Sequence, residues 1–153
     1  MGRRSRSKRS KERKQKRKRR QGATRTAQAR PSIEELIQIG DFNGAIALLE
    51  ERLAESERAE DLRLLVDVLC RKAERTNYPE RKALYSRAAD YLQRLPVSLE
   101  AKELRLRTVV ACNAERWAEA TSWAEQLLAV EQTAFAYYYR AVAAAGTFVF
   151  WDL

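Results

Sequence analysis

The residue types best suited to chemistry are the basic side chains of the first twenty positions. Residues 1–20 hold thirteen lysines and arginines against one acid, Glu12, and no apolar side chain follows Met1. Such side chains neutralise phosphates and release the counterions that condense on nucleic acids. We expect nucleic acid to bind at this basic arm, whose thirteen residues are Arg3, Arg4, Arg6, Lys8, Arg9, Lys11, Arg13, Lys14, Lys16, Arg17, Lys18, Arg19 and Arg20.

The composition of the basic arm predicts contacts to the phosphate backbone rather than to bases. The arm has no aromatic side chain for base stacking and no polar set that would read base edges. Arginine-rich segments often fold on binding RNA, so RNA is favoured over DNA. Three other roles stay open: a targeting signal, a contact with an anionic membrane surface, or an inert or intramolecular segment attracted to Glu50, Glu51, Glu55, Glu57, Glu60 and Asp61.

Charge is divided unevenly along the chain. Residues 1–30 contain fifteen basic residues and one acid, whereas residues 31–153 contain fifteen basic residues and twenty acids, so the net charges of +14 and −5 give the total of +9. A segment with so little apolar surface cannot offset the loss of conformational entropy on folding. We therefore predict a disordered tail over residues 1–30 and one folded domain over residues 31–153.

The residues that usually carry catalysis are missing or scattered. The chain has no histidine, which removes the commonest general base and metal ligand. Its five glycines form no phosphate-binding loop. Cys70 and Cys112 are too far apart in sequence to suggest a zinc site, and their apolar settings predict free buried thiols. We expect a protein that is not an enzyme and that uses no cofactor, metal or small-molecule substrate.

Hydrophobic spacing and capping signals predict seven helices after the basic segment. Ser32 and Glu35 form a capping box ahead of an apolar run. Apolar residues then recur at helical spacing, and no segment alternates with a period of two. The sequence therefore predicts an all-α domain with helices over about residues 32–39, 42–54, 59–75, 80–95, 98–113 and 117–130, and from about residue 133 onward.

The predicted last helix is aromatic and has no partner helix after it. Its apolar stripe is expected at Phe135, Tyr138, Val142 and Ala145, and further aromatic residues lie at Tyr137, Tyr139, Phe148, Phe150 and Trp151. Helical repeat arrays usually end in a polar cap. This end therefore predicts a docked protein, a self-association surface or a chain that continues in a longer protein, unless the aromatic residues fold back onto the last groove.

Two passages suggest an internal repeat. GDFNGAI at residues 40–46 resembles the G-D-Y-x-x-A-I passage of the tetratricopeptide repeat family, and ERWAEA at residues 115–120 lies 75 residues later, or two periods of about 37. The sequence departs from the family at its short first helix, at Arg52, where a small residue is usual, and in having a closing proline only at Pro96. KALYSRA at residues 82–88 is similar to the motif of the half-a-tetratricopeptide subfamily, which occurs in RNA-processing complexes.

This resemblance covers residues 32–148. It implies a short right-handed α-solenoid of about three and a half helix-turn-helix repeats, which presents a concave surface to a protein partner and has no catalytic role.

Three arginines recur near the repeat period. Arg71, Arg105 and Arg140 are spaced by 34 and 35 residues, each on the first helix of a proposed unit. If the units stack, they form a column on one face, where guanidinium groups suit a carboxylate-rich peptide or a second run of phosphates. The other reading is three exposed arginines on ordinary helices.

The sequence as a whole predicts an adaptor. We expect the helical domain to bind a protein partner through its groove or its aromatic end, while the arm binds nucleic acid. The alternative is a protein–protein interaction module whose arm is only a targeting signal or a membrane contact. No apolar run approaches the length of a membrane span, and no secretory signal is expected. We predict a soluble intracellular protein, cytoplasmic, or nuclear or nucleolar in a eukaryote.

Overall fold

The computed structural model describes residues 31–149, and the side chains of residues 31–146. The helices described below belong to one compact unit that begins at Ile33. The predicted disordered tail over residues 1–30 lies outside the described residues.

Residues 31–149 fold into seven helices with no strand among them, as the hydrophobic spacing predicts. The all-α fold is therefore confirmed. Within this range helix covers all but the short turns and connections, of which the longest run over residues 75–79 and 94–100. The helices are α2 (Ile33–Ile39), α3 (Phe42–Glu55), α4 (Ala59–Glu74), α5 (Glu80–Gln93), α6 (Ala101–Asn113), α7 (Trp117–Val130) and α8 (Ala134–Val149).

One helix start differs clearly from the prediction. α6 begins at Ala101 rather than at Ser98. The Ser98 hydroxyl accepts a hydrogen bond from the backbone N–H of Glu100 at 3.2 Å, and Glu100 has extended backbone angles. Ser98 therefore stabilises the connection before the helix instead of capping the helix itself.

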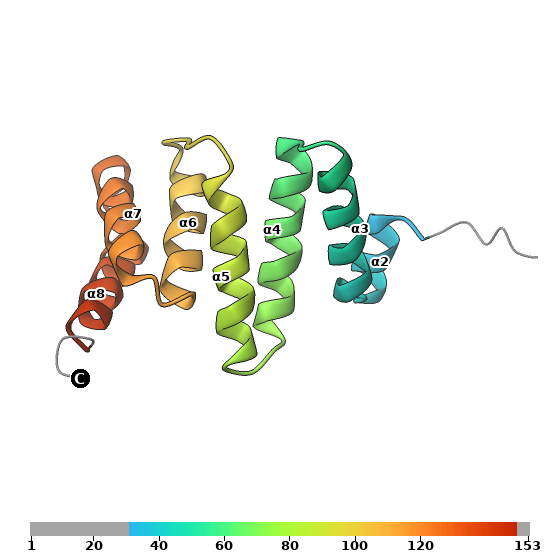
Figure 1. The fold of residues 1–153 in the computed structure, drawn as a ribbon. Helices are drawn as coiled ribbons and strands as arrows, with labels where there is room; N and C mark the ends of the chain where they lie inside the picture. Colours follow the sequence, from blue (N-terminus) through green and yellow to red (C-terminus); the bar gives the residue numbers. More distant parts are fainter. Residues whose placement is uncertain (1–30, 150–153) are drawn as a thin grey trace, which may run out of the picture. The chain divides into compact units, whose positions relative to one another are not determined.

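The helices are stacked in a row in which each packs against the next (Figure 1), and α6 also packs against α8. The apolar stripe of α3 is buried and consists of Phe42, Ala45, Ile46, Leu49 and Leu53. One core cluster runs from α2 to the end of α6, and two smaller clusters join α6, α7 and α8. The apolar core is thus continuous along the first five helices and divided at the end of the row.

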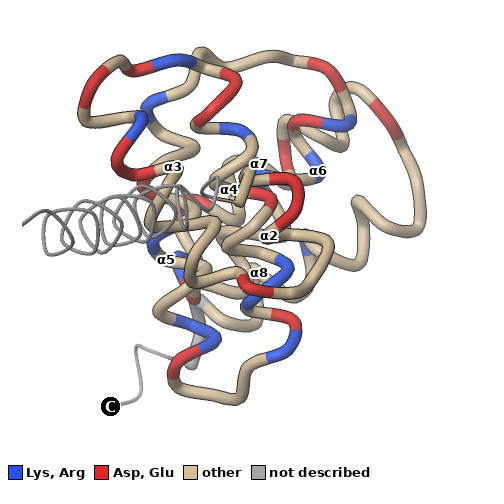
Figure 2. Tube along the Cα trace, turned by 90° about the vertical axis from the view of Figure 1, so that its right-hand side faces the viewer, with Lys and Arg blue, Asp and Glu red and all other residues tan. Residues whose placement is uncertain are grey.

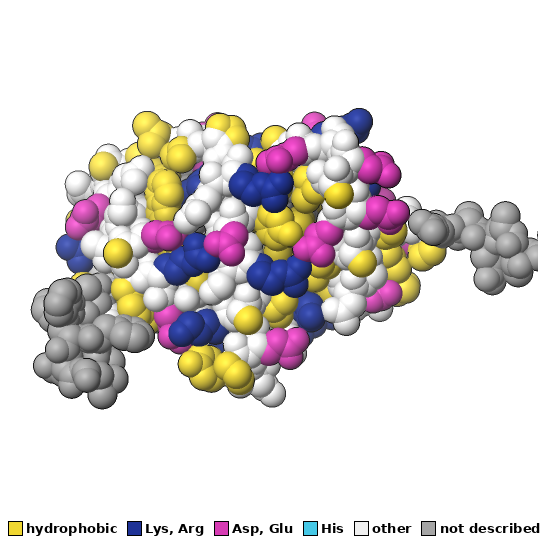
Figure 3. Space-filling view, viewed as in Figure 1, with side chains coloured by type: hydrophobic (Ala, Val, Ile, Leu, Met, Phe, Trp, Pro, Cys, Tyr) yellow, Lys and Arg dark blue, Asp and Glu magenta, His cyan; other side chains and the backbone are white. Residues whose placement is uncertain are grey.

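Two ion pairs at a repeated spacing link α3 and the connection after it to α5 and its C-cap residue. Glu50 accepts from Arg87 at 2.6 Å, and Glu57 accepts from Arg94 at 3.0 Å, both across 37 residues. This interval agrees with the period expected from the sequence, so the fold is repeat-like. Acidic and basic residues share the helices (Figure 2) and lie side by side on the face in Figure 3. Exposed pairs of this kind contribute ~0–1 kcal/mol each.

The buried face of α8 is rotated from the predicted stripe. Tyr138 is 62% exposed and Ala145 is also exposed, whereas Ala136 and Ala143 are buried. The reason is close packing against α7, because a Cβ atom added at Gly146 would overlap the indole ring of Trp117. Small residues therefore take the inner positions, and the prediction for Tyr138 and Ala145 is wrong.

We expect Gly146→Ala to lower the free energy of unfolding by up to about 2 kcal/mol. Alanine favours a helix by about 1 kcal/mol, but overpacking against Trp117 costs about 1–3 kcal/mol. Chemical denaturation followed by circular dichroism measures the difference. The control is Ala145→Gly on the exposed side, which changes helix propensity alone. A stabilised Gly146→Ala variant would contradict the tight contact.

Candidate binding groove

A cavity of about 520 Å³ lies between two alternate helices of the row, α4 and α6. The end of α5 and the connection that follows it complete its wall. This volume lies in the usual range for a binding pocket. The cavity is lined by Arg63, Val66 and Asp67 of α4, Leu92 of α5, Ser98 and Glu100 of the connection, and Lys102, Glu103 and Leu106 of α6. We call this cavity the α4–α6 groove.

The floor of the α4–α6 groove is apolar. Val66 and Leu92 are buried members of the main core, and Leu106 is 36% exposed on the α6 side. An exposed leucine beside two buried apolar residues offers a surface that loses water when an apolar side chain enters. The floor therefore suits a leucine-sized side chain of a bound segment.

The rim of the groove carries charges of both signs, and they are not equally available. Asp67 is bound by Arg71 at 2.9 Å and Glu103 by Arg107 at 3.0 Å. Within the described part of the chain, Arg63 and Lys102 form no ion pair, and neither does Glu100. The unpaired charges of the rim are therefore two positive and one negative, a net of +1, although the helical domain as a whole is acidic.

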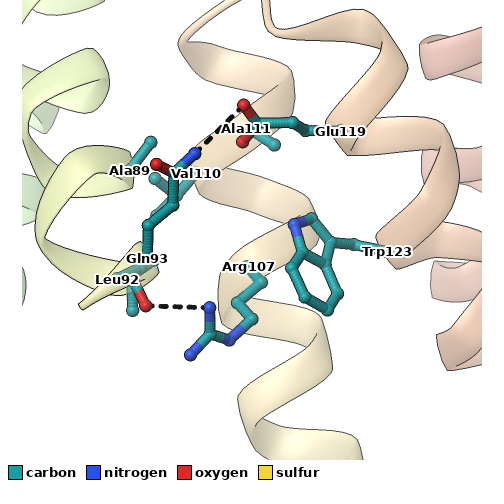
Figure 4. Close-up of a pocket in the computed structure, with 8 residues that line it drawn as sticks. All are labelled: Ala89, Leu92, Gln93, Arg107, Val110, Ala111, Glu119 and Trp123. Atoms are coloured by element: carbon teal, nitrogen blue, oxygen red, sulfur yellow. Dashed lines mark hydrogen bonds between the residues drawn. The ribbon is translucent and has the colours of Figure 1, made fainter. Parts of the chain in front are cut away.

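A buried arginine, Arg107, holds Glu103 of the groove wall in place. Arg107 is 3% exposed, and its guanidinium group donates to the Glu103 carboxylate at 3.0 Å. It also donates to the backbone carbonyls of Leu92 at 2.9 Å and Leu95 at 3.3 Å, at the end of α5. Its guanidinium lies 5.1 Å from the ring centre of Trp123 on α7 (Figure 4). One side chain thus joins α5, α6 and α7.

Arg107 was not among the site residues expected from the sequence, although its position contains a signal. Arg107 lies three residues after Leu104 and four before Ala111, inside the apolar stripe of α6. Glu103 precedes it by one helical turn. A cation in an apolar stripe with an acid four residues earlier indicates a buried ion pair.

The small cavity in Figure 4 is not a ligand site. It measures about 10 Å³ and lies between Arg107, Trp123 and the end of α5. Gln93 donates to Glu119 at 3.2 Å across its edge. This volume has room for about one water molecule.

The three arginines expected to form a column are each bound to a different carboxylate. Arg105 makes a bidentate pair with Glu131 at 2.5 and 2.7 Å, and these hydrogen bonds lower the pKa of Glu131. Arg71 pairs with Asp67 at 2.9 Å, and Arg140 pairs with Glu125 at 3.0 Å. Of the three, Arg71 borders the α4–α6 groove through Asp67. Their joint role in binding a partner stays a prediction.

The thirteen basic residues of the arm lie outside the described residues. Some of the acids that could attract the arm have partners within the helical domain. Glu50 binds Arg87 and accepts from Tyr91 at 2.8 Å, while Glu57 binds Arg94. Asp61 is buried and lies 3.0 Å from Arg52. Because these acids already have partners, the hypothesis that the arm binds to them within the same chain is less favoured.

Both cysteines are free thiols, as predicted, and neither is activated. Cys112 is buried and Cys70 is half-buried. Burial raises the pKa of Cys70 to about 12 and that of Cys112 to about 11. Such thiols stay protonated near neutral pH and are poor nucleophiles.

The residues that the structure describes contain no cluster of acids or cysteines that could hold a metal ion. None of the described helices has the length and apolarity that a membrane span requires.

No protein-family model, curated protein or solved structure matches the chain. The resemblance to the tetratricopeptide repeat family therefore stays a prediction, and the groove is interpreted from its own residues.

We expect Arg107→Met to lower the free energy of unfolding by about 3–5 kcal/mol. The substitution leaves the partly buried Glu103 carboxylate without its cation and removes one donor from each of the Leu92 and Leu95 carbonyls. Urea denaturation followed by circular dichroism measures this loss. Arg105→Met is the matched control, because it removes an exposed pair and should cost less than about 1 kcal/mol. Equal losses would contradict the supporting role of Arg107.

Proposed function

We propose that the chain is a non-enzymatic adaptor. Its helical domain binds a protein partner in the α4–α6 groove, and its basic arm binds nucleic acid, with RNA preferred. The observation that carries this proposal is the separation of charge: thirteen basic residues and one acid in residues 1–20, ahead of a helical domain whose basic residues are mostly paired.

The ion pairs of the helical domain support separate roles for the two parts of the chain, with nucleic acid bound by the arm and not by the helices. A paired cation has little capacity left for phosphate, because its carboxylate must first be displaced. Affinity for a polyanion therefore belongs to the arm. The paired basic residues are Arg52, Arg71, Lys72, Lys82, Arg87, Arg94, Arg105, Arg107, Arg116 and Arg140.

The α4–α6 groove supports a protein partner of particular chemistry. Its floor accepts an apolar side chain, and Arg63 and Lys102 supply positive charge on opposite helices. A peptide segment with a leucine flanked by aspartate or glutamate satisfies both features. The residues that line the groove include no histidine and no cysteine, which favours binding over catalysis at this site.

We expect the full chain to bind single-stranded RNA with a steep dependence on salt. If about six phosphates are neutralised, the slope of log K against log salt is about −4. Fluorescence anisotropy with labelled RNA and duplex DNA, measured across a salt series, tests this. Residues 31–153, which contain the compact helical unit, should not bind.

A control variant of the same length distinguishes binding that depends on the charge of the arm from binding that needs only a segment of that length. In this variant the thirteen basic residues of the arm are replaced by glutamine. Binding by the variant equal to that of the full chain would overturn the nucleic-acid role. Binding of the full chain to phosphatidylserine vesicles but not to RNA or DNA would instead support the membrane-contact alternative.

For the α4–α6 groove we expect an acidic leucine-containing peptide to bind more tightly than the same peptide with lysine in place of each acid. Arg63→Glu combined with Lys102→Glu should weaken the acidic peptide about tenfold, or ~1.4 kcal/mol. Anisotropy of labelled peptides measures both effects. Arg81→Glu is the control, because Arg81 is exposed on α5 and does not line the groove. Unchanged affinity in the double variant would exclude this groove as the site.

A further inference from the structure

α8 has apolar residues on two opposite sides. Its inner side packs against α6 and α7 through Ala136, Tyr139 and Ala143. Since successive residues of a helix are about 100° apart, the opposite side consists of Ala134, Tyr137, Tyr138, Ala141 and Ala145. All five are exposed. We call these five residues the outer stripe of α8.

The outer stripe contains no charge. Arg140 is the one charged residue of α8, and it lies beside the stripe, held 3.0 Å from Glu125 of α7. Tyr137 is 56% exposed and Tyr138 is 62% exposed. A helix that is apolar all round is normally buried on all sides. Among the helices that the structure describes, α6 and α7 pack against α8, and both lie on one side of it (Figure 1).

The outer stripe is divided by side-chain size. Its two tyrosines lie in the first half of the helix, and Ala141 and Ala145 lie further along. When such a helix meets a second copy in antiparallel orientation about a two-fold axis at Ala141, each Tyr137 faces an Ala145. The large side chains of each copy then pack against the small side chains of the other. Where the two α8 helices cross, the alanines let their axes approach to ~8 Å.

We infer that the outer stripe of α8 binds the same stripe of a second copy of this chain, antiparallel and two-fold symmetric. Size complementarity with itself selects this occupant, since a two-fold contact brings identical surfaces together. Because the stripe carries no charged side chain, the contact places no like charges directly opposite each other. A contact between one pair of helices buries less surface than the ~800 Å² per partner that is typical of a stable interface. The dimer is therefore weak and depends on concentration.

A dimer would carry two basic arms. Two arms on one assembly bind neighbouring stretches of a polyanion, and the second binding event becomes intramolecular. This consequence depends on the proposed nucleic-acid role of the arm, but dimer formation itself does not.

Sedimentation equilibrium of the full chain from micromolar to about millimolar concentration tests the inference. We expect a reversible monomer–dimer equilibrium, and Ala141→Glu should weaken the dimer at least tenfold because two carboxylates then meet at the axis. Ala83→Glu is the matched control on an exposed position of α5. A monomer at every concentration, or a dimer that Ala141→Glu leaves unchanged, overturns the inference.

Cysteine cross-linking tests the orientation. Ala141→Cys should give a covalent dimer on mild oxidation, because the two Cα atoms at the axis fall within the ~4.4–6.8 Å that a disulfide spans. Tyr137→Cys should not, because the equivalent residues are about eight helical positions, or ~12 Å, apart. Cross-linking of both variants would indicate a parallel pair and overturn the antiparallel arrangement. The unmodified chain, with Cys70 and Cys112, is the background control.

Discussion

The packing of the later helices depends on the buried guanidinium group of Arg107. It contacts the end of α5 through the carbonyls of Leu92 and Leu95, and the ring of Trp123 on α7. Leu92 belongs to the main core and Trp123 to the smaller clusters, so Arg107 bridges the place where the core divides. Because Glu103, its ionic partner, also lines the α4–α6 groove, the stability of this joint and the shape of the groove depend on the same pair.

The sequence predicts the helices well because most of them contrast an apolar stripe with a charged face. That contrast sets both the number of helices and their buried positions, as in α3 and α4. It fails at α8, where apolar residues occur on all sides. Because α8 has no polar side that must face solvent, the apolar pattern does not define which side of the helix is buried. The close packing of Gly146 on Trp117 decides it, and that contact depends on the position of α7.

The candidate groove could be predicted only in part. The period of Arg71, Arg105 and Arg140 draws attention to the alternate helices α4, α6 and α8, and the groove does lie between two of them. Its wall also needs Ser98 and Glu100, in a connection that the sequence predicts as helix. A basic residue is available to a ligand only if no carboxylate from another part of the fold binds it, as Glu131 binds Arg105. The residue pattern of one helix contains no information about such contacts.

Salt separates the interactions proposed for this chain. Contacts of the arm with phosphate weaken steeply as salt rises, because counterions are released on binding. The apolar floor of the groove and the outer stripe of α8 lose no driving force under the same conditions. The exposed ion pairs between helices are screened as well, but each contributes little against an apolar core that spans the first five helices. An adaptor of the proposed kind would release a polyanion at a salt concentration that leaves its fold and its self-association intact, and its peptide contact would lose only the part that depends on Arg63 and Lys102.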